Sequence, residues 1–388
     1  MSYSLPSLKN RINELIRIAS VSSSTPEWDM PNLPVIEKLA EWFSQLGFNV
    51  HIQEISPGKA NLLAVYGQGN GGLVLSGHTD TVPFNESCWT HPPLQLTETG
   101  NRWYGLGTAD MKSFFALIIE AVIPLLENDF KSPLVILATA DEESSMSGAR
   151  ALSKSQFGQS RAAIIGEPTR LIPINMHKSI SLLSLSVTGQ SGHSSNPELG
   201  KNALDAMHDM ISTLKTYRHE LGQKYRNNAF EVAVPTMNLG CIHGGDNPNR
   251  ICNNCELHFD LRGLPGMPNQ ELQDTILTRL KPIAAEHEVR MELKKLFGGV
   301  EAFEQPRNSE LVQLAEKLTG HPSQAVAFAT EAPFLQQLGL QTLVLGPGSI
   351  DQAHQPDEYM AMEQITPCVE LLDQFIRYYC FHQPMKKA

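Results

Sequence analysis

The sequence has no apolar run of the roughly 20 residues that a membrane-spanning helix needs, and no cluster of basic residues. Its formal net charge is -11, from 30 Lys and Arg against 41 Asp and Glu. Basic patches bind the phosphates of nucleic acids, so we expect neither a nucleic-acid partner nor a membrane partner. The N-terminal stretch also lacks the charged and then apolar pattern of a signal peptide, and we therefore expect a cytoplasmic protein.

Cysteine is scarce, with six among 388 residues, and only Cys252 and Cys255 form a C-x-x-C pair. No second pair follows at the spacing of a zinc finger. The surrounding stretch, "RICNNCELHFDLR", alternates like a strand that places Cys255 on the apolar face and Cys252 on the opposite face. We therefore predict free thiols that are buried or half-buried, and neither a metal site nor a redox motif.

The length of 388 residues suggests two or three domains. In the first half of the chain, amphipathic or wholly apolar helical patterns alternate with short apolar runs. This alternation is typical of an α/β domain in which helices cover both faces of a mostly parallel sheet. Helices are expected over 33–47 and 111–128, and strands over 72–77, 133–140 and 162–166.

The pattern changes between residues 180 and 298, where the expected order is strand, helix, two strands, helix, strand. This order is that of a ferredoxin-like α+β module. The strand-like run 342–349 and a helix over 366–382 then return to the α/β pattern, so the module is predicted to be inserted into the larger domain. The expected strands of the module cover 180–189, 230–242, 251–262 and 289–296, and its helices start at 203 and 269.

Residues with metal-ligand side chains follow several of the expected strands. In an open α/β sheet, ligands bind outside the carboxyl ends of the strands. Histidines and carboxylates are ligands of zinc and related divalent metals. Like charges about 4 Å apart repel by roughly 4 kcal/mol at an intermediate dielectric, so a run of three acids needs a compensating charge, which we expect to be metal. The residues that follow strands are His78, Asp80, Asp141, Glu142, Glu143, Glu167 and His354, and Asp110, just before the helix expected over 111–128, can join the same edge.

Each of these residues has a simpler explanation when it is taken alone. His78 would be a hydrogen-bonded loop histidine, and His354 a surface residue. The acids 141–143 would lie in a solvated loop or at a helix N-terminus, where the dipole favours them. Glu167 before Pro168 would belong to a turn. Their joint placement at strand ends favours one common site, because independent accidents would seldom produce it.

Several motifs resemble the zinc-dependent aminoacylase and carboxypeptidase family, whose members have two-metal sites. The resemblance covers nearly the whole chain and implies a catalytic domain (1–179 and 299–388) with an inserted ferredoxin-like dimerisation and lid domain (180–298). One departure is Ser113, where the family usually has glycine. The motifs are "SGHTDTVP", "YGLGTADMKS", "ATADEESSMSGAR", "IIGEPT", "GQSGHSS", "NRICNNCELHFDLR", "TEAPF" and "GPGSIDQAHQPDEY".

The resemblance implies two metal ions, zinc with cobalt as the alternative, bridged by the carboxylate of Asp110. His78 and Glu167 would also bind the first ion, and Glu143 and His354 would also bind the second. Asp80 would accept a hydrogen bond from His78, and Glu142 would be the general base. If the acids continue an extended strand, Glu142 and Glu143 point opposite ways and cannot both bind one ion. A cis peptide between Asp110 and Met111 is also expected.

Substrate contacts are implied in the same way. Asn249 and Arg250 would bind the substrate α-carboxylate, although a solvated loop is the alternative. Glu331 would lie near a substrate ammonium group, or else act as a helix-cap carboxylate. His193 would reach the active site of the partner subunit in a homodimer and stabilise an oxyanion there, where an exposed loop residue is the simpler explanation.

The implied activity is hydrolysis of a small N-acyl amino acid, with N2-acetyl-L-ornithine as the expected substrate. A succinyl-diaminopimelate or dipeptide substrate is the alternative within the family. From other classes, a non-catalytic metal-binding protein and a metal-free hydrolase that uses paired carboxylates stay open.

Overall fold

The computed structural model describes residues 5–381, and its chain divides into two compact units. The first unit comprises residues 1–175, 305–324 and 330–388, and the second comprises 176–304 and 325–329. The range 176–304 contains the module that the sequence places at 180–298. A role of this module in dimerisation stays a prediction.

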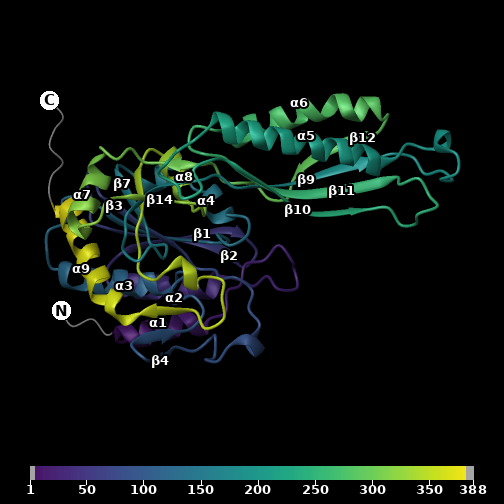
Figure 1. Ribbon diagram of the computed structural model, residues 1–388. Helices are drawn as coiled ribbons and strands as arrows, with labels where there is room; N and C mark the ends of the chain where they lie inside the picture. Colours follow the sequence, from purple (N-terminus) through teal and green to yellow (C-terminus); the bar gives the residue numbers. More distant parts are fainter. Residues whose placement is uncertain (1–4, 382–388) are drawn as a thin grey trace. The chain divides into compact units, whose positions relative to one another are not determined.

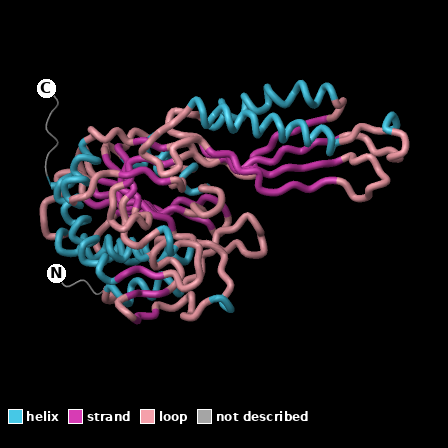
Figure 2. The backbone as a smooth tube through the Cα atoms, viewed as in Figure 1, coloured by secondary structure: helices cyan, strands magenta, loops and turns pink. Residues whose placement is uncertain are grey.

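The first unit is built around a mixed sheet with a parallel centre (Figures 1 and 2). The central strands β6, β3, β7 and β15 run parallel to one another, whereas the β1–β2, β2–β6 and β15–β8 pairs are antiparallel. The mostly parallel sheet is thus confirmed, with antiparallel edges in addition. In sheet order the strands are β1 (Asn49–Ser56), β2 (Lys59–Tyr66), β6 (Leu134–Thr139), β3 (Leu73–His78), β7 (Ala162–Ile165), β15 (Gln341–Val344), β8 (Ile174–His177) and β13 (Phe303–Glu304), and β14 (Gln324–Val326) pairs with β8.

The helices of the first unit pack against this sheet and against one another. Helix α2 lies on β1 and β2, and α3 contacts α1 and α9. Every residue of α3 except Glu120 is buried, which explains its uniformly apolar sequence. The helices are α1 (Leu8–Arg17), α2 (Leu33–Gln45), α3 (Ser113–Val122), α4 (Ser147–Arg150), α7 (Glu310–Thr319), α8 (Ala332–Gln337) and α9 (Ile365–Ile376), and a small sheet contains β16 (Tyr359–Ala361), β5 (Arg102–Tyr104) and β4 (Thr97–Thr99).

Two of the expected helices are shorter than the sequence pattern suggests. Helix α3 ends at Val122 and a 3-10 turn follows over Ile123–Leu125, because Pro124 cannot donate the next helical hydrogen bond. Helix α9 contains Pro367 in its first turn and gives way to a π-helical turn, Arg377–Phe381. The last residue of the expected helix, His382, lies outside the described residues.

The second unit has the predicted ferredoxin-like order, with α5 and α6 on one face of a four-stranded antiparallel sheet (Figure 1). Two expected strands are wrong at their starts, because β10 begins at Thr236 and not at residue 230, and β11 begins at Asn254 and not at residue 251. Pro235 has no N–H, so the ladder with β11 starts after it. In sheet order the strands are β10 (Thr236–Gly244), β11 (Asn254–Arg262), β9 (Ser181–Thr188) and β12 (Arg290–Lys295), and the helices are α5 (Ala203–Lys224) and α6 (Asn269–Glu286).

The predicted burial of the two thiols is confirmed, since Cys252 and Cys255 are both buried free thiols. The predicted opposite face for Cys252 is wrong, because β11 begins at Asn254 and both cysteines belong to the same buried cluster.

The two ends of the longer inserted segment are hydrogen-bonded to each other. The main-chain N–H of Gln305 donates to the carbonyl of Asn175 at 2.8 Å, and the Asn175 side-chain amide donates to the carbonyl of Gln305 at 2.9 Å. The ladder continues with Met176 opposite Glu304. The chain therefore leaves the first unit and returns to it at neighbouring positions.

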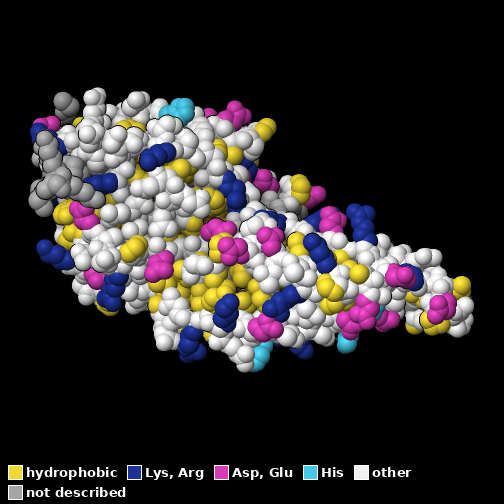
Figure 3. Space-filling view, turned by 90° about the horizontal axis from the view of Figure 1, so that it is seen from above, with side chains coloured by type: hydrophobic (Ala, Val, Ile, Leu, Met, Phe, Trp, Pro, Cys, Tyr) yellow, Lys and Arg dark blue, Asp and Glu magenta, His cyan; other side chains and the backbone are white. Residues whose placement is uncertain are grey.

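Within residues 5–381, no helix combines the length and the apolar character that crossing a bilayer requires. On the face shown in Figure 3, basic and acidic side chains are interspersed.

His177, at the end of β8, is a fully buried histidine whose ring lies 5.3 Å from that of Phe303. Its Nδ1 is 2.8 Å from the carbonyl oxygen of Lys178. Burial lowers the pKa of His177 from 6.5 to about 4, because the charged imidazolium cannot be hydrated there. The folded protein therefore holds this side chain neutral at pH values where the unfolded chain protonates it.

We expect the free energy of unfolding to fall as the pH drops from 6.5 toward 4, since the unfolded state binds the extra proton. His177 alone should contribute about 2 to 3 kcal/mol of this loss at pH 4.5, at about 1.4 kcal/mol per pKa unit. Urea unfolding of the wild type and of His177→Gln at pH 7 and 4.5 measures the difference. The exposed His51→Gln is the control and should follow the wild type, and equal losses in His177→Gln and wild type would contradict the assignment.

Candidate metal centre

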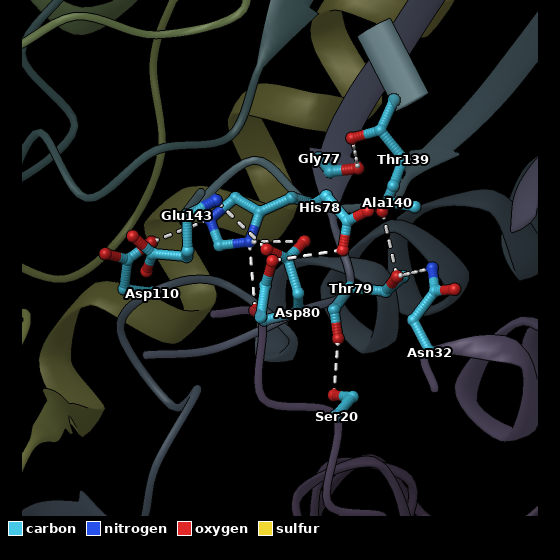
Figure 4. A network of polar contacts seen from close by, with 12 residues as sticks. Ser20, Asn32, Gly77, His78, Thr79, Asp80, Asp110, Thr139, Ala140 and Glu143 are labelled. Carbon is cyan, nitrogen blue, oxygen red and sulfur yellow. Dashed lines mark hydrogen bonds and ion pairs between the residues drawn. The ribbon is translucent and has the colours of Figure 1, made fainter. Parts of the chain in front are cut away.

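The predicted ligands gather at the carboxyl edge of the parallel strands in the first unit, and Figure 4 shows His78, Asp110 and Glu143 among them. His78 is the last residue of β3 and pairs in the ladder with Thr139, the last residue of β6. Glu167 follows the neighbouring strand β7 after one residue. Because these strands are parallel and adjacent, side chains that are far apart in the sequence meet at one edge.

The imidazole of His78 is held in one orientation. Its Nδ1 lies 3.0 Å from the main-chain oxygen of Asp80, so this nitrogen donates. Its Nε2 faces Asp110 Oδ1 at 2.9 Å and Glu167 Oε1 at 3.8 Å. Donation from Nδ1 leaves Nε2 as the unprotonated nitrogen of the neutral ring, which is the form that binds a metal.

Asp80 accepts a hydrogen bond from His78, as expected, but it does so through the main chain. The Asp80 carbonyl oxygen lies 3.0 Å from His78 Nδ1, whereas the carboxylate Oδ1 lies 3.7 Å from it. The carboxylate turns instead to the next loop, where Oδ2 accepts the main-chain N–H of Glu143 at 3.0 Å. Asp80 thereby fixes the position of Glu143 relative to His78.

Asp110 presents one oxygen to each of the two histidines. Oδ1 faces His78, and Oδ2 lies 3.6 Å from Nε2 of His354. The same His354 nitrogen is 3.0 Å from Oε2 of Glu143. The expected cis peptide between Asp110 and Met111 is confirmed. The predicted residues thus form two adjoining clusters that share the Asp110 carboxylate.

Glu142 lies beside His78 and Glu167. Ligand-type atoms of His78, Asp110 and Glu143 lie within 4.8 Å of one another, and so do those of His78, Glu142 and Glu167. The expectation of an extended segment here is wrong, because β6 ends at Thr139 and Asp141 has a left-handed φ of 58°. A turn directs the acids, so strand alternation does not divide their roles.

The carboxylates of this site repel one another in a desolvated setting. Burial, and then the negative charges of neighbouring carboxylates, raise the pKa of Glu143 and raise those of Glu142 and Glu167 well above the ordinary range. Burial alone would also raise the pKa of Asp110, but the hydrogen bond and charge of His78 outweigh it and lower that pKa. The site therefore carries more negative charge than its surroundings compensate.

The histidines respond in the opposite direction. The hydrogen bond to Glu143 raises the pKa of His354 to about 9. Burial would lower the pKa of His78, but the bond to Asp110 and the nearby carboxylates raise it well above 6.5. Nitrogen and carboxylate donors that attract positive charge this strongly suit divalent cations, and the shared carboxylate suits a pair of them. The residues present therefore fit the metals that the resemblance implies.

Glu358 is a component of the site that the sequence prediction missed. Its buried carboxylate accepts the main-chain N–H groups of Gly107, Ala109 and Asp110 at 2.8 to 3.2 Å. Burial raises the pKa of Glu358 to about 8, with the charge of Asp110 as the second cause. The carboxylate holds the loop that carries Asp110, and its only signal in the sequence is an acid four residues after His354.

Glu331 lies at the start of α8 but does not cap that helix through its side chain. Oε2 accepts a hydrogen bond from Thr139 Oγ1 at 2.9 Å, at the end of β6. Within the described residues, its buried Oε1 has no hydrogen-bond partner. Burial raises the pKa of Glu331 to about 7. The helix-cap alternative for Glu331 is therefore excluded in the described structure.

His193, Asn249 and Arg250 lie in the second unit, where they meet one another. His193 and Arg250 form an isolated antiparallel bridge, and the N–H of Ser194 donates to the carbonyl of Asn249 at 3.1 Å. The N–H of Ser195 donates to His193 Nδ1 at 3.2 Å, which places the proton of the neutral ring on Nε2. All three predicted residues are exposed.

Comparisons with known proteins show the family and the fold of the chain. Residues 74–378 match the model of peptidase family M20/M25/M40. Over 377 residues the chain is 49% identical to acetylornithine deacetylase of Vibrio vulnificus, which covers 97% of this chain and 100% of that protein. Aminopeptidase PepT of Bacillus cereus has a similar fold, with a TM-score of 0.75 at 18% identity over 95% of this chain and 97% of that one. The Bacillus subtilis protein YXEP, a dinuclear metal-binding peptidase, has a similar fold with a TM-score of 0.68. The sequence identity is 14%, and the match covers 95% of this chain and 96% of that one.

Proposed function

Because the chain belongs to peptidase family M20/M25/M40, we propose that it is a metal-dependent hydrolase that converts N2-acetyl-L-ornithine and water into L-ornithine and acetate. The observation that carries the reaction type is the Asp110 carboxylate, which offers one oxygen to each histidine. The substrate rests on the near-full-length likeness to a deacetylase of that name. The reaction would belong to arginine biosynthesis in the cytoplasm.

Two divalent ions, zinc or alternatively cobalt, would be held with Asp110 between them. His78 and Glu167 would hold one ion, and Glu143 and His354 the other. Such a pair polarises an amide carbonyl and makes water a stronger acid. The side chains supply the remaining steps of the reaction.

Glu142 is the proposed general base. It takes a proton from the water that attacks the amide carbon, and it later delivers that proton to the leaving nitrogen as the C–N bond breaks. A positioned proton shuttle of this kind is worth about 10² to 10⁴ in rate. Its location beside His78 and Glu167, and a pKa raised by burial and neighbouring acids, support a group that both accepts and releases a proton.

Hydrolysis of a panel of N-acylated amino acids tests the proposal, with N2-acetyl-L-ornithine expected to be the best substrate. Glu142→Gln should lower kcat by about 10² to 10⁴ while bound metal is retained, because the shuttle is lost and the predicted ligands stay. Better hydrolysis of succinyl-diaminopimelate or of a dipeptide would instead favour those members of the family. Metal without any amide hydrolysis would favour a non-catalytic protein, and full activity after exhaustive chelation would favour a metal-free hydrolase.

The substrate contacts follow from charge. Asn249 and Arg250 would bind the α-carboxylate, which a guanidinium matches with two parallel hydrogen bonds. Glu331 would face the side-chain ammonium of ornithine. Support for Glu331 comes from its unpartnered Oε1, a buried acceptor that a cation would satisfy.

If Glu331 recognises the ammonium group, Glu331→Gln should raise KM for N2-acetyl-L-ornithine more than KM for an acetylated neutral amino acid of similar length. The reason is that only the first substrate loses a charge-assisted contact, which is worth about 1.5 to 3 kcal/mol. Steady-state kinetics on both substrates gives the comparison. An equal rise in KM for both would remove this role from Glu331.

We also propose a homodimer in which His193 of one subunit donates to the oxyanion formed in the active site of the other. Its Nε2–H is the free donor once Ser195 has donated to Nδ1. A donor of this kind is worth on the order of 10² to 10³ in rate. In a two-fold dimer the exchange is reciprocal, so each active site would need residues from both chains.

Complementation tests the exchange. Glu142→Ala and His193→Ala should each be nearly inactive as homodimers, but a mixed dimer contains one site with both residues intact. Random assembly makes about half of the dimers mixed, so co-expression should restore about a quarter of wild-type activity. Mixed dimers that form, as shown by two affinity tags, but recover no activity would contradict action across the interface.

A further inference from the structure

Asp141, the first of the three consecutive acids, has different partners from the other two. Its Oδ1 accepts a hydrogen bond from Ser22 Oγ at 3.0 Å and forms an ion pair with Lys59 Nζ at 2.7 Å. Its Oδ2 accepts a hydrogen bond from Ser147 Oγ at 2.8 Å. No cluster of possible metal ligands among residues 5–381 includes Asp141. Its charge is therefore compensated by protein side chains.

Lys59 is a buried cation that comes from the first residue of β2. Its side chain is 6% exposed, and Nζ lies 2.7 Å from Asp141 and 2.8 Å from Asp29. A buried ion pair of this kind is costly to break from one side, because the remaining charge is left without a partner. Lys59 and Asp29 lie outside residues 74–378, which match the family model.

The main chain of Asp141 shapes the loop that carries the next two acids. Its φ of 58° is left-handed, a conformation that aspartate adopts more readily than most residues. Its carbonyl accepts the N–H groups of Ser144, Ser145 and Met146 at 3.4, 3.1 and 2.6 Å. These bonds close the turn from which Glu142 and Glu143 project.

We propose that Lys59 is a positioning residue for the metal centre, acting through Asp141. The ion pair anchors the Asp141 side chain, which fixes the turn, and the turn directs Glu143 toward the metal and Glu142 toward the attacking water. The inference rests on the proposed function only for the role of Glu142. The positioning of Glu143 is independent of the substrate.

Lys59→Met tests the inference, with Arg11→Met as a matched control. Arg11 is also a buried cation of the first unit, with a side chain 3% exposed and paired with Glu120, but it joins α1 to α3 away from the acid turn. Both variants should lower Tm. Only Lys59→Met should weaken zinc binding to the metal-free protein, by about 10- to 100-fold in calorimetry, as loss of a group that orients ligands typically does.

Two further measurements separate positioning from general damage. The visible spectrum of the cobalt-loaded protein should change in Lys59→Met and not in Arg11→Met, since it reports ligand geometry. If the wild type hydrolyses N2-acetyl-L-ornithine, kcat should fall about 10- to 100-fold in Lys59→Met with KM changed less than about 3-fold. If the wild type lacks this activity, the proposed function is refuted. Zinc affinity and the cobalt spectrum then still decide whether Lys59 positions the metal ligands.

The outcome that overturns the inference is a Lys59→Met protein with a lower Tm but unchanged zinc affinity and cobalt spectrum. If that variant does not fold, Asp141→Asn breaks the same pair with a residue that accepts the left-handed backbone. It should weaken zinc binding and alter the cobalt spectrum in the same way. Wild-type values in Asp141→Asn would equally refute the role.

Discussion

Negative charge buried at the carboxyl edge of a parallel sheet is the constraint on which the first unit depends. The strands β3, β6 and β7 end side by side, so the carboxylates that follow them meet where little water reaches. Each acid needs a partner, and the partners differ. Asp141 has a lysine, Glu358 has three main-chain N–H groups, and Asp110 has two histidines. Divalent cations would compensate the remaining negative charge, which Glu142 and Glu167 carry.

The acids therefore divide into two groups. One group accepts hydrogen bonds that fix loops, and the other lies where metal and substrate would bind. Asp80 and Glu358 accept N–H groups from the loops that carry Glu143 and Asp110, so they act on the backbone. Burial, and then the charges of neighbouring carboxylates, raise the pKa values of Glu142, Glu143 and Glu167, although the hydrogen bond from His354 opposes this rise at Glu143. A rigid framework of satisfied carboxylates thus surrounds a smaller group that attracts metal.

Much of this architecture is predictable from the sequence because it follows from periodicity. The apolar runs that become β3, β6 and β7, and the strand-helix order of the second unit, are read from the alternation of side chains. The strand ends also place His78, Glu143, Glu167 and His354 at one edge, which Asp110 joins from the loop before α3. The start of β10 after Pro235 and the end of α3 before Pro124 are harder to predict, because the apolar pattern continues past both prolines.

What the sequence does not predict depends on three-dimensional partners. The turn at Asp141 needs Lys59 and Ser22, which lie 82 and 119 residues away in the chain. His78 Nδ1 donates to the carbonyl oxygen of Asp80 at 3.0 Å and not to its carboxylate Oδ1 at 3.7 Å. A difference this small cannot be predicted from the sequence. No local sequence pattern indicates the role of Glu358, because its carboxylate oxygens accept hydrogen bonds from a loop about 250 residues earlier in the chain.

The hydrogen-bonded pair of Asn175 and Gln305 has a consequence for how such a protein could arise. A segment of more than a hundred residues between them begins and ends at neighbouring points, so inserting it leaves no long gap for the host to close. A short turn between these two positions would restore a continuous first unit. The predicted metal ligands all lie outside the segment, so one module can replace another there while the ligands keep their strands.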